Sequence, residues 1–272
     1  MKQFLPTLNQ KKVGAVAKLD KKKKTLQQHG IKSLSFARFI PNLITLAAVC
    51  IGLSAIQFSL KGRWEIAVLS IFFAGLLDGM DGRVARILGS PSKFGAELDS
   101  LADFCNFGVS PAVVLYLYGL DQLGRIGWAV CLFYVMCMAL RLARFNTLID
   151  APEESKPLSS KFFMGTSAPV TAMLVLLPMI IDFQIAPNHL SSVFSAILML
   201  AIGFLAVSKI PTFSFKGGNV LKKYVLPLFL FSLSTLAGLV MFTWFTLTFI
   251  GFIYMALIPL SILAAKKESA EK

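Results

Sequence analysis

The sequence predicts an all-α integral membrane protein with about eight transmembrane helices in one bundle. Of its 272 residues, 56% are hydrophobic and only 15% are charged, and the mean hydropathy is +0.71. Several apolar runs reach the roughly 20 residues that a helix needs to cross a bilayer. The connections between the runs are short, which favours one domain over two.

Glycine, proline and charged residues separate the apolar runs from one another. Lys61-Gly62-Arg63 ends the first run, and Gly89-Ser90-Pro91-Ser92 ends the second, since such residues break helices or prefer water. The apolar stretch from Tyr224 to Ala265 is too long for one span, so we expect a tight hairpin near residues 240–243. The spans are expected at residues 40–60, 64–88, 93–119, 125–147, 162–183, 190–210, 223–241 and 244–264.

The two ends of the chain are expected to lie outside the bundle. Residues 1–38 are rich in lysine and lack the apolar core of a signal peptide, so we expect a basic cytoplasmic tail. The segment from Ile31 to Phe39, which leads from the tail into the first span, mixes apolar and basic residues. It fits either an interfacial helix or a plain linker. The transmembrane domain is expected over residues 39–265, followed by a cytoplasmic tail over residues 266–272.

The distribution of basic residues predicts that both termini are cytoplasmic. Cytoplasmic loops of membrane proteins carry an excess of lysine and arginine. With eight spans and the amino terminus inside, only Lys61, Arg63 and Arg125 of the 27 basic residues lie outside, which leaves 24 inside. The formal net charge of +13 therefore fits contact with anionic membrane lipids rather than with nucleic acid.

Four aspartates lie within the apolar sequence of the second and third expected spans. Asp78 and Asp81 share one helical face, because steps of three and four residues return to the same face. Asp99 and Asp103 share a face of the next helix for the same reason. Two antiparallel helices joined by a short loop would point all four carboxylates into one cavity on the cytoplasmic side. Asp182 falls near a span end instead, where we expect it to be solvated.

Four carboxylates in a partly dehydrated space repel one another, so the group must take up protons or bind cations. All-oxygen ligands favour Mg²⁺, Mn²⁺ or Ca²⁺ over zinc. Two ions shared by Asp78, Asp81, Asp99 and Asp103 would hold a phosphoryl or pyrophosphate group. The alternatives are ion pairs with nearby arginines, or a cation pathway of the kind that a cation-coupled transporter uses.

Small residues lie in phase with the carboxylates. Gly82 and Ala85 follow Asp81 on the same helical face, and Gly95 precedes Asp99 by one turn. Small side chains allow a ligand to approach the helix backbone closely, but they also serve helix packing in membranes. Combined with the aspartates, they indicate a nucleotide-sized groove.

The pattern Asp-x2-Asp-Gly-x2-Ala-Arg-x8-Gly-x3-Asp-x3-Asp resembles the signature of the CDP-alcohol phosphotransferases. The resemblance implies a membrane enzyme that uses a CDP-linked donor and two divalent cations, Mg²⁺ or Mn²⁺, and that forms a homodimer. It implies that the four aspartates bind the metals and that Asp103 is also the general base. The matching positions are Asp78, Asp81, Gly82, Ala85, Arg86, Gly95, Asp99 and Asp103.

Further stretches resemble the bacterial phosphatidylserine synthases of that family. This resemblance implies transfer of the phosphatidyl group from CDP-diacylglycerol to L-serine, at the cytoplasmic face of a bacterial inner membrane. Glycerol 3-phosphate, inositol phosphate and choline remain alternative acceptors, although a phosphorylated acceptor would need more basic residues than this pocket offers. The stretches are residues 39–45, 97–103, 107–112, 141–147, 163–169 and 208–212.

Polar residues at the inner ends of the first and fourth spans are candidates for substrate binding. Arg141 and Arg144, assisted by Asn146, suit the serine carboxylate, because a guanidinium binds a carboxylate through two hydrogen bonds. Anchoring to lipid headgroups would explain the same arginines. Asn42 and Thr45 suit the cytidine or ribose, although Asn42 after Pro41 also suits a helix cap. The CDP-lipid site is thus expected to comprise Gly82, Ala85, Arg86, Gly95, Asn42 and Thr45.

Overall fold

The computed structural model describes most of the expected bundle. The described residues are 39–89, 92–149, 162–164, 166–185, 190–208, 211–213 and 222–270. The expected basic tail, with its interfacial helix or linker, lies outside these residues.

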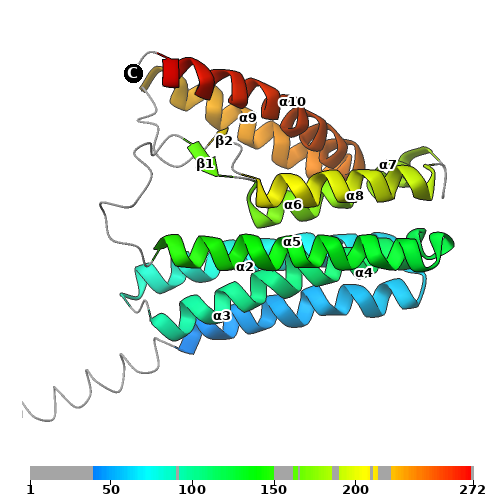
Figure 1. The fold of residues 1–272 in the computed structure, drawn as a ribbon. Helices are drawn as coiled ribbons and strands as arrows, with labels where there is room; N and C mark the ends of the chain where they lie inside the picture. The colour runs from blue at the N-terminus through cyan, green and yellow to red at the C-terminus, as the bar shows by residue number, and fades with distance from the viewer. Residues whose placement is uncertain are drawn as a thin grey trace, which may run out of the picture.

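The described chain is a bundle of helices that run roughly along one direction (Figure 1). Helix α5 packs against α8, and the terminal hairpin of α9 and α10 packs onto the bundle through α7. The helices are Phe39–Leu60, α2 (Trp64–Ile87), α3 (Lys93–Asp103), the π-helical turn η1 (Phe104–Val109), α4 (Ser110–Tyr118), the short turn η2 (Leu120–Leu123), α5 (Arg125–Ile149), α6 (Ala168–Val175), α7 (Leu177–Ile185), α8 (Ser192–Val207), α9 (Lys222–Met241) and α10 (Thr243–Ala270).

The expectation of a helical integral membrane protein is confirmed. Among the described residues, three helices are long and apolar enough to cross a membrane: Phe39–Leu60, Lys93–Tyr118 and Arg125–Thr147. The pair α6 and α7, bent by 42°, counts as a fourth if it is one broken span. The other expected spans coincide with helices α2, α8, α9 and α10, and their crossing of a membrane stays a prediction, as do the cytoplasmic termini.

The connections between helices agree with the breakers in the sequence. Gly62, Gly89 and Gly124 have φ angles of 69°, 58° and 57°, a backbone conformation that side chains with a Cβ rarely adopt. The expected terminal hairpin is confirmed, because α9 ends at Met241 and α10 begins at Thr243. Helix α10 continues to Ala270, so most of the expected carboxyl-terminal tail is helical.

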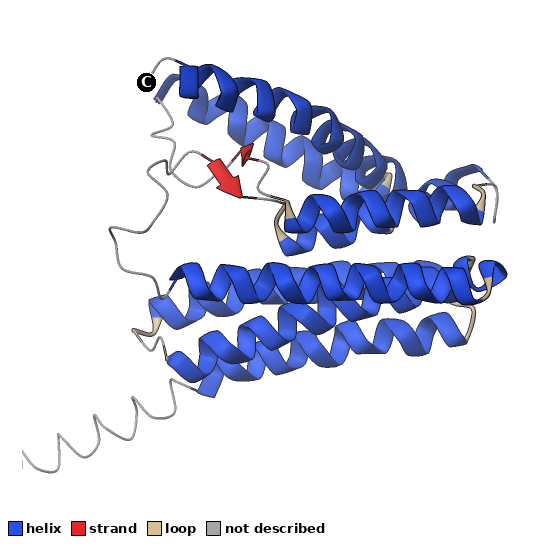
Figure 2. Cartoon of the chain, viewed as in Figure 1, coloured by secondary structure: helices blue, strands red, loops and turns tan. Residues whose placement is uncertain are grey.

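A small β ladder corrects the purely helical expectation. Strand β1 (Phe162–Met164) pairs antiparallel with β2 (Pro211–Phe213) (Figure 2). We expected a span to begin at residue 162, but the helix begins only at Ala168. Pro169 explains the delay, because proline lacks an N–H and fits the first turn of a helix but not its interior.

Small residues line the buried face of the first helix. Such residues let neighbouring helix backbones approach closely within a membrane. This helix therefore lies near enough to α2 and α3 for its side chains to reach the aspartates. The buried positions are Pro41, Thr45, Ala48, Gly52, Ala55 and Ser59.

Candidate functional site

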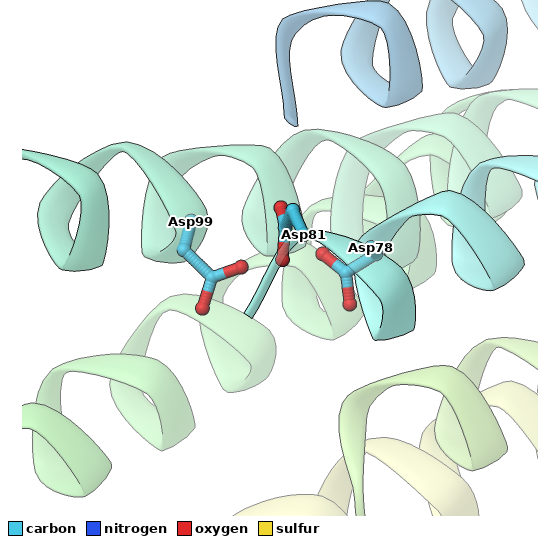
Figure 3. Close-up of side chains that lie close together, drawn as sticks. All are labelled: Asp78, Asp81 and Asp99. Atoms are coloured by element: carbon cyan, nitrogen blue, oxygen red, sulfur yellow. The ribbon is translucent and has the colours of Figure 1, made fainter. Parts of the chain in front are cut away.

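Three aspartates from two helices converge at one point. Asp78 and Asp81 come from the second half of α2, and Asp99 comes from the middle of α3. One carboxylate oxygen of each lies within 4.8 Å of the others, and Figure 3 shows the three side chains grouped together. Asp81 is buried, with 5% of its surface exposed, while the other two are half-buried. The helical phase thus places these three carboxylates as expected.

Asp103 lies beside this group but is not one of its three members. Its carboxyl group shares a side-chain hydrogen bond with that of Asp78 and interacts electrostatically with the guanidinium of Arg141. One oxygen of Asp78 and one of Asp103 are buried without a hydrogen-bond partner in the described part of the chain. Adjacent buried carboxyl groups with unpaired oxygens must share protons or bind a cation. The residues present therefore fit a divalent metal with oxygen ligands.

Thr45 holds one of the carboxylates in place. Its hydroxyl lies 2.5 Å from Oδ2 of Asp81 and 3.1 Å from the carbonyl oxygen of Pro41. An ionised carboxylate can only accept hydrogen bonds, so Thr45 donates its hydrogen to Asp81. We expected Thr45 at the nucleotide, and the structure places it on the aspartate cluster. The role was missed because the two residues lie 36 positions apart in the chain.

Arg141, whose guanidinium interacts electrostatically with Asp103, carries one unpaired donor. Its Nε donates to the carbonyl oxygen of Thr166 at 2.7 Å, which fixes the guanidinium from one side. Its Nη1 is buried and has no partner among the residues that the structure describes. A guanidinium that is held by one edge while another nitrogen stays unpaired suits an anionic ligand group, either a carboxylate or a phosphate.

The other two candidates on α5 contact neighbouring helices. Arg144 donates from Nη1 to the carbonyl oxygen of Val207 in α8, at 3.3 Å. Asn146 forms two hydrogen bonds with Ser100. Its Nδ2 donates to the Ser100 Oγ at 3.0 Å, and the Ser100 hydroxyl donates to the Asn146 Oδ1 at 3.2 Å. Asn146 therefore ties α5 to α3 at the residue that follows Asp99.

The small residues beside the carboxylates divide into two kinds. Gly82 is exposed, and a Cβ added there would meet no described atom within 4 Å, so this face of α2 is open to a ligand. A Cβ at Gly95 would lie 3.1 Å from Oδ1 of Asn42. Gly95 therefore allows close packing of the first helix on α3. Ala85 is half-buried, and the exposed Arg86 donates to the carbonyl oxygen of Gly82 at 3.1 Å.

Comparisons with known proteins match most of the chain. The family model described as CDP-alcohol phosphatidyltransferase matches residues 38–212, and a model described as CDP-alcohol phosphatidyltransferase 2 matches residues 223–259. A CDP-diacylglycerol–serine O-phosphatidyltransferase of Mycobacterium leprae is 41% identical over 176 residues, which is 64% of this chain and 58% of that protein. The match thus spans less than two thirds of that relative. The protein of the same description from Mycobacterium bovis is 36% identical over 227 residues, covering 83% of this chain and 78% of the relative.

A solved structure is also similar in part. It is the crystal structure of Mycobacterium tuberculosis phosphatidylinositol phosphate synthase with CDP-DAG bound. The TM-score is 0.48 and the sequence identity 18%, with 64% of this chain and 87% of that one covered.

Proposed function

The chain belongs to the CDP-alcohol phosphatidyltransferase family, and from this premise we propose that it transfers the phosphatidyl group of CDP-diacylglycerol to L-serine. The products are phosphatidylserine and CMP. The observation that carries the proposal is the convergence of Asp78, Asp81 and Asp99 beside Asp103 and Arg141. The descriptions of the mycobacterial relatives support the choice of donor and acceptor.

The aspartates would hold the metal ions. Asp78, Asp81 and Asp99 supply three oxygens within 4.8 Å of one another, and Asp103 supplies a fourth carboxylate next to Asp78. Bound Mg²⁺ or Mn²⁺ would withdraw charge from the pyrophosphate and stabilise CMP as the leaving group. Because Thr45 engages Oδ2 of Asp81, it orients this carboxylate towards the cluster.

Asp103 is the proposed general base as well as a ligand. It removes the proton of the serine hydroxyl as the oxygen attacks the phosphorus that carries the diacylglycerol group. The new bond joins the serine oxygen to that phosphorus, and the bond to the CMP oxygen breaks on the opposite side. The interactions of Asp103 with both Asp78 and Arg141 support this role, because they connect it to the aspartate cluster and to the proposed acceptor site.

Arg141 is the proposed anchor for the serine carboxylate. Its unpaired Nη1 lies on the guanidinium that faces Asp103, so a serine bound there would carry its hydroxyl towards the base. Arg144 and Asn146 complete the proposed serine pocket from the next turn of α5, where Asn146 also fixes Ser100.

The proposed CDP-lipid site lies along the open face of α2. Gly82 leaves space next to the carboxylates, and Ala85 and Arg86 extend this face by one turn. Asn42, Thr45 and Gly95 close the site from the first helix and from α3. We also propose a homodimer in a bacterial inner membrane. The expected excess of basic residues on the inside supports a site that faces the cytoplasm.

A direct assay tests the proposed reaction. Purified protein is incubated with CDP-diacylglycerol, Mg²⁺ or Mn²⁺, and one labelled alcohol at a time, and CMP release is measured. We expect release with serine alone. Release only with glycerol 3-phosphate, inositol phosphate or choline would overturn the choice of acceptor. Ion flux into liposomes that contain no CDP-lipid, with no CMP release in the assay, would support a transporter instead.

A further inference from the structure

Tyr254 lies on the face of helix α10 that packs onto the bundle. This face also carries Leu247 and Gly251, which are buried and precede Tyr254 at the steps of four and three that one side of a helix requires. Tyr254 is half-buried and packs against the hydrophobic core. Its neighbours Ile253 and Met255 are exposed. The helix therefore directs Tyr254 towards the other helices, whereas its two neighbours face outward.

Helix α10 runs antiparallel to the bent pair α6 and α7. In its second turn, the Thr248 hydroxyl accepts a hydrogen bond from Nε2 of Gln184 at 2.6 Å. A Cβ at Gly251 would lie 2.9 Å from Cδ1 of Leu177 and 3.7 Å from Cε of Met173. As the chain advances along α10, its partners thus move back along α7 and into α6.

The next turn of α10, which carries Tyr254, continues towards the beginning of α6. Helix α6 begins at Ala168, two residues after Thr166. The carbonyl oxygen of Thr166 accepts the hydrogen bond from Nε of Arg141 at 2.7 Å. Helix α10 also packs against β2, whose partner strand β1 ends two residues before Thr166. The packing of α10 therefore brings Tyr254 towards the segment that holds the Arg141 guanidinium.

The electrostatics agree with this placement. Arg141 interacts electrostatically with Asp103 of α3 and with Tyr254 of α10. Two helices besides α5 thus contribute a side chain to the surroundings of this guanidinium. The terminal hairpin of α9 and α10 therefore extends to the proposed acceptor site.

A phenol hydroxyl beside a guanidinium suits an anionic ligand group. The guanidinium supplies positive charge and N–H donors, and the phenol adds one O–H donor. A carboxylate has two oxygens with about four positions that accept hydrogen bonds, so it can accept from both side chains at once. Hydrogen bonds to ionised groups are also stronger than those between neutral groups. Such a pair favours an alcohol that carries a carboxylate or phosphate over a cationic one such as choline.

We propose that Tyr254 is a substrate-binding residue whose phenol hydroxyl donates to the anionic group of the acceptor that Arg141 also binds. With serine, this group is the carboxylate. The inference rests on the proposed function and deepens it, because it assigns part of the selection of the acceptor to the terminal hairpin. This hairpin lies beyond residues 38–212, which the first family model matches, and Tyr254 falls within residues 223–259, which the second model matches.

The first experiment measures the kinetics of CMP release. Tyr254→Phe removes only the hydroxyl and keeps the ring in its packing. It should raise KM for serine about tenfold, because a hydrogen bond to a charged group is lost, while kcat and KM for CDP-diacylglycerol stay within about twofold. Arg141→Gln should also raise KM for serine about tenfold or more. Addition of Tyr254→Phe to Arg141→Gln should raise it less than about twofold further, because both side chains bind the same group.

Tyr116→Phe is the matched control for this substitution. Tyr116 is also half-buried against the core, but it packs on Trp128, which lies thirteen residues before Arg141 on α5, about 20 Å at 1.5 Å per residue. Its replacement should leave kcat and both KM values within about twofold of wild type. An unchanged KM for serine in Tyr254→Phe, equal effects of the two tyrosine variants, or full additivity with Arg141→Gln would overturn the proposal.

The second experiment does not depend on turnover. Equilibrium binding of labelled L-serine to the purified protein should weaken about tenfold in Tyr254→Phe and stay unchanged in Tyr116→Phe. Equal dissociation constants in wild type and Tyr254→Phe would overturn the role of Tyr254. Serine binding without CMP release would refute the proposed reaction alone. If the wild type instead releases CMP only with another alcohol, the proposed acceptor is wrong, and an unchanged KM for that alcohol in Tyr254→Phe would overturn the role of Tyr254 as well.

Discussion

Asp182 and Asp78 lie at opposite ends of the bundle and have opposite surroundings. Asp182, on α7, is 2% exposed, and it accepts hydrogen bonds from the Leu190 backbone N–H at 3.0 Å and from the Tyr118 hydroxyl at 3.2 Å. Tyr118 also contacts Trp64, so the start of α2 lies at the Asp182 end. Asp78 lies fourteen residues after Trp64 on the same helix, which is about 20 Å at 1.5 Å per residue. Figure 1 shows α7 at one end of the bundle and the start of α3 at the other.

The two ends differ in what the neighbouring side chains do. Around Asp182, aromatic rings pack edge to face, as Tyr118 does on Phe183 and Phe183 on Trp244. Around Asp78, Gly79 and Gly82 are exposed, and a Cβ at either would meet no described atom within 4 Å. A carboxylate whose oxygens are bonded inside a closed aromatic cluster stabilises the fold. An unpaired carboxylate next to open glycines is available for a ligand. Burial alone therefore does not identify a functional aspartate.

Removal of metal should cause the largest loss of activity, because it affects the Asp78 end of the bundle and not the Asp182 end. We expect chelation to abolish CMP release, because without bound metal the carboxylates around Asp78 would repel the pyrophosphate instead of stabilising it. Addition of Mg²⁺ or Mn²⁺ should restore it. Asp99→Asn should show a similar loss and weaker Mn²⁺ binding in electron paramagnetic resonance titrations. Full activity after thorough chelation would contradict the metal assignment.

Replacement of the proposed base, Asp103, should cause the second-largest loss of activity. Asp103→Asn should lower kcat by about 10² to 10⁴-fold, the range that general acid–base catalysis contributes. The melting temperature in detergent should stay near that of wild type, because the variant also removes repulsion from Asp78. Normal CMP release from this variant with metal and both substrates supplied would refute the role of Asp103.

Loss of the hydrogen bond to Asp81 should have a moderate effect. Thr45→Val keeps the side-chain shape but removes the donor, and a hydrogen bond to a charged group contributes about 1.5–3 kcal/mol. We expect roughly a tenfold or greater fall in CMP release at limiting metal, with partial recovery at high metal concentration. Ser59→Ala is the matched control, because Ser59 is buried on the same helix and its hydroxyl donates within that helix, to the carbonyl oxygen of Ala55. Equal effects of the two variants would assign Thr45 to packing.

The smallest effect on catalysis should come from replacement of Asp182, which lies within the closed aromatic cluster. Asp182→Ala removes the hydrogen bonds that its carboxylate accepts from the Leu190 N–H and the Tyr118 hydroxyl. This should lower the free energy of unfolding by about 1–3 kcal/mol. The melting temperature should fall, while kcat per folded molecule stays within twofold of wild type. A large loss of kcat at an unchanged melting temperature would show that the contrast between the two ends is wrong.

Much of the candidate site could be predicted from local pattern. The phase of Asp78 and Asp81 on α2 follows from the helical period, and so does the alignment of Asp99 with Asp103 on the next helix. The breakers at Gly62 and Gly89 marked real turns. The expectation that Asp182 is solvated was wrong, because its acceptor role depends on Tyr118, 64 positions earlier in the chain.

The sequence by itself determined a helical membrane protein with acidic residues in phase on two successive helices, because hydropathy and helical period are local properties. Only the tertiary structure decided which carboxylates are bonded and which stay unpaired. Thr45 meets Asp81 and Gly52 meets Asn106 across helix contacts, and the packing of α10 on α7 brings Tyr254 towards Arg141. Such pairings depend on how the helices pack, and no local pattern of residues encodes them.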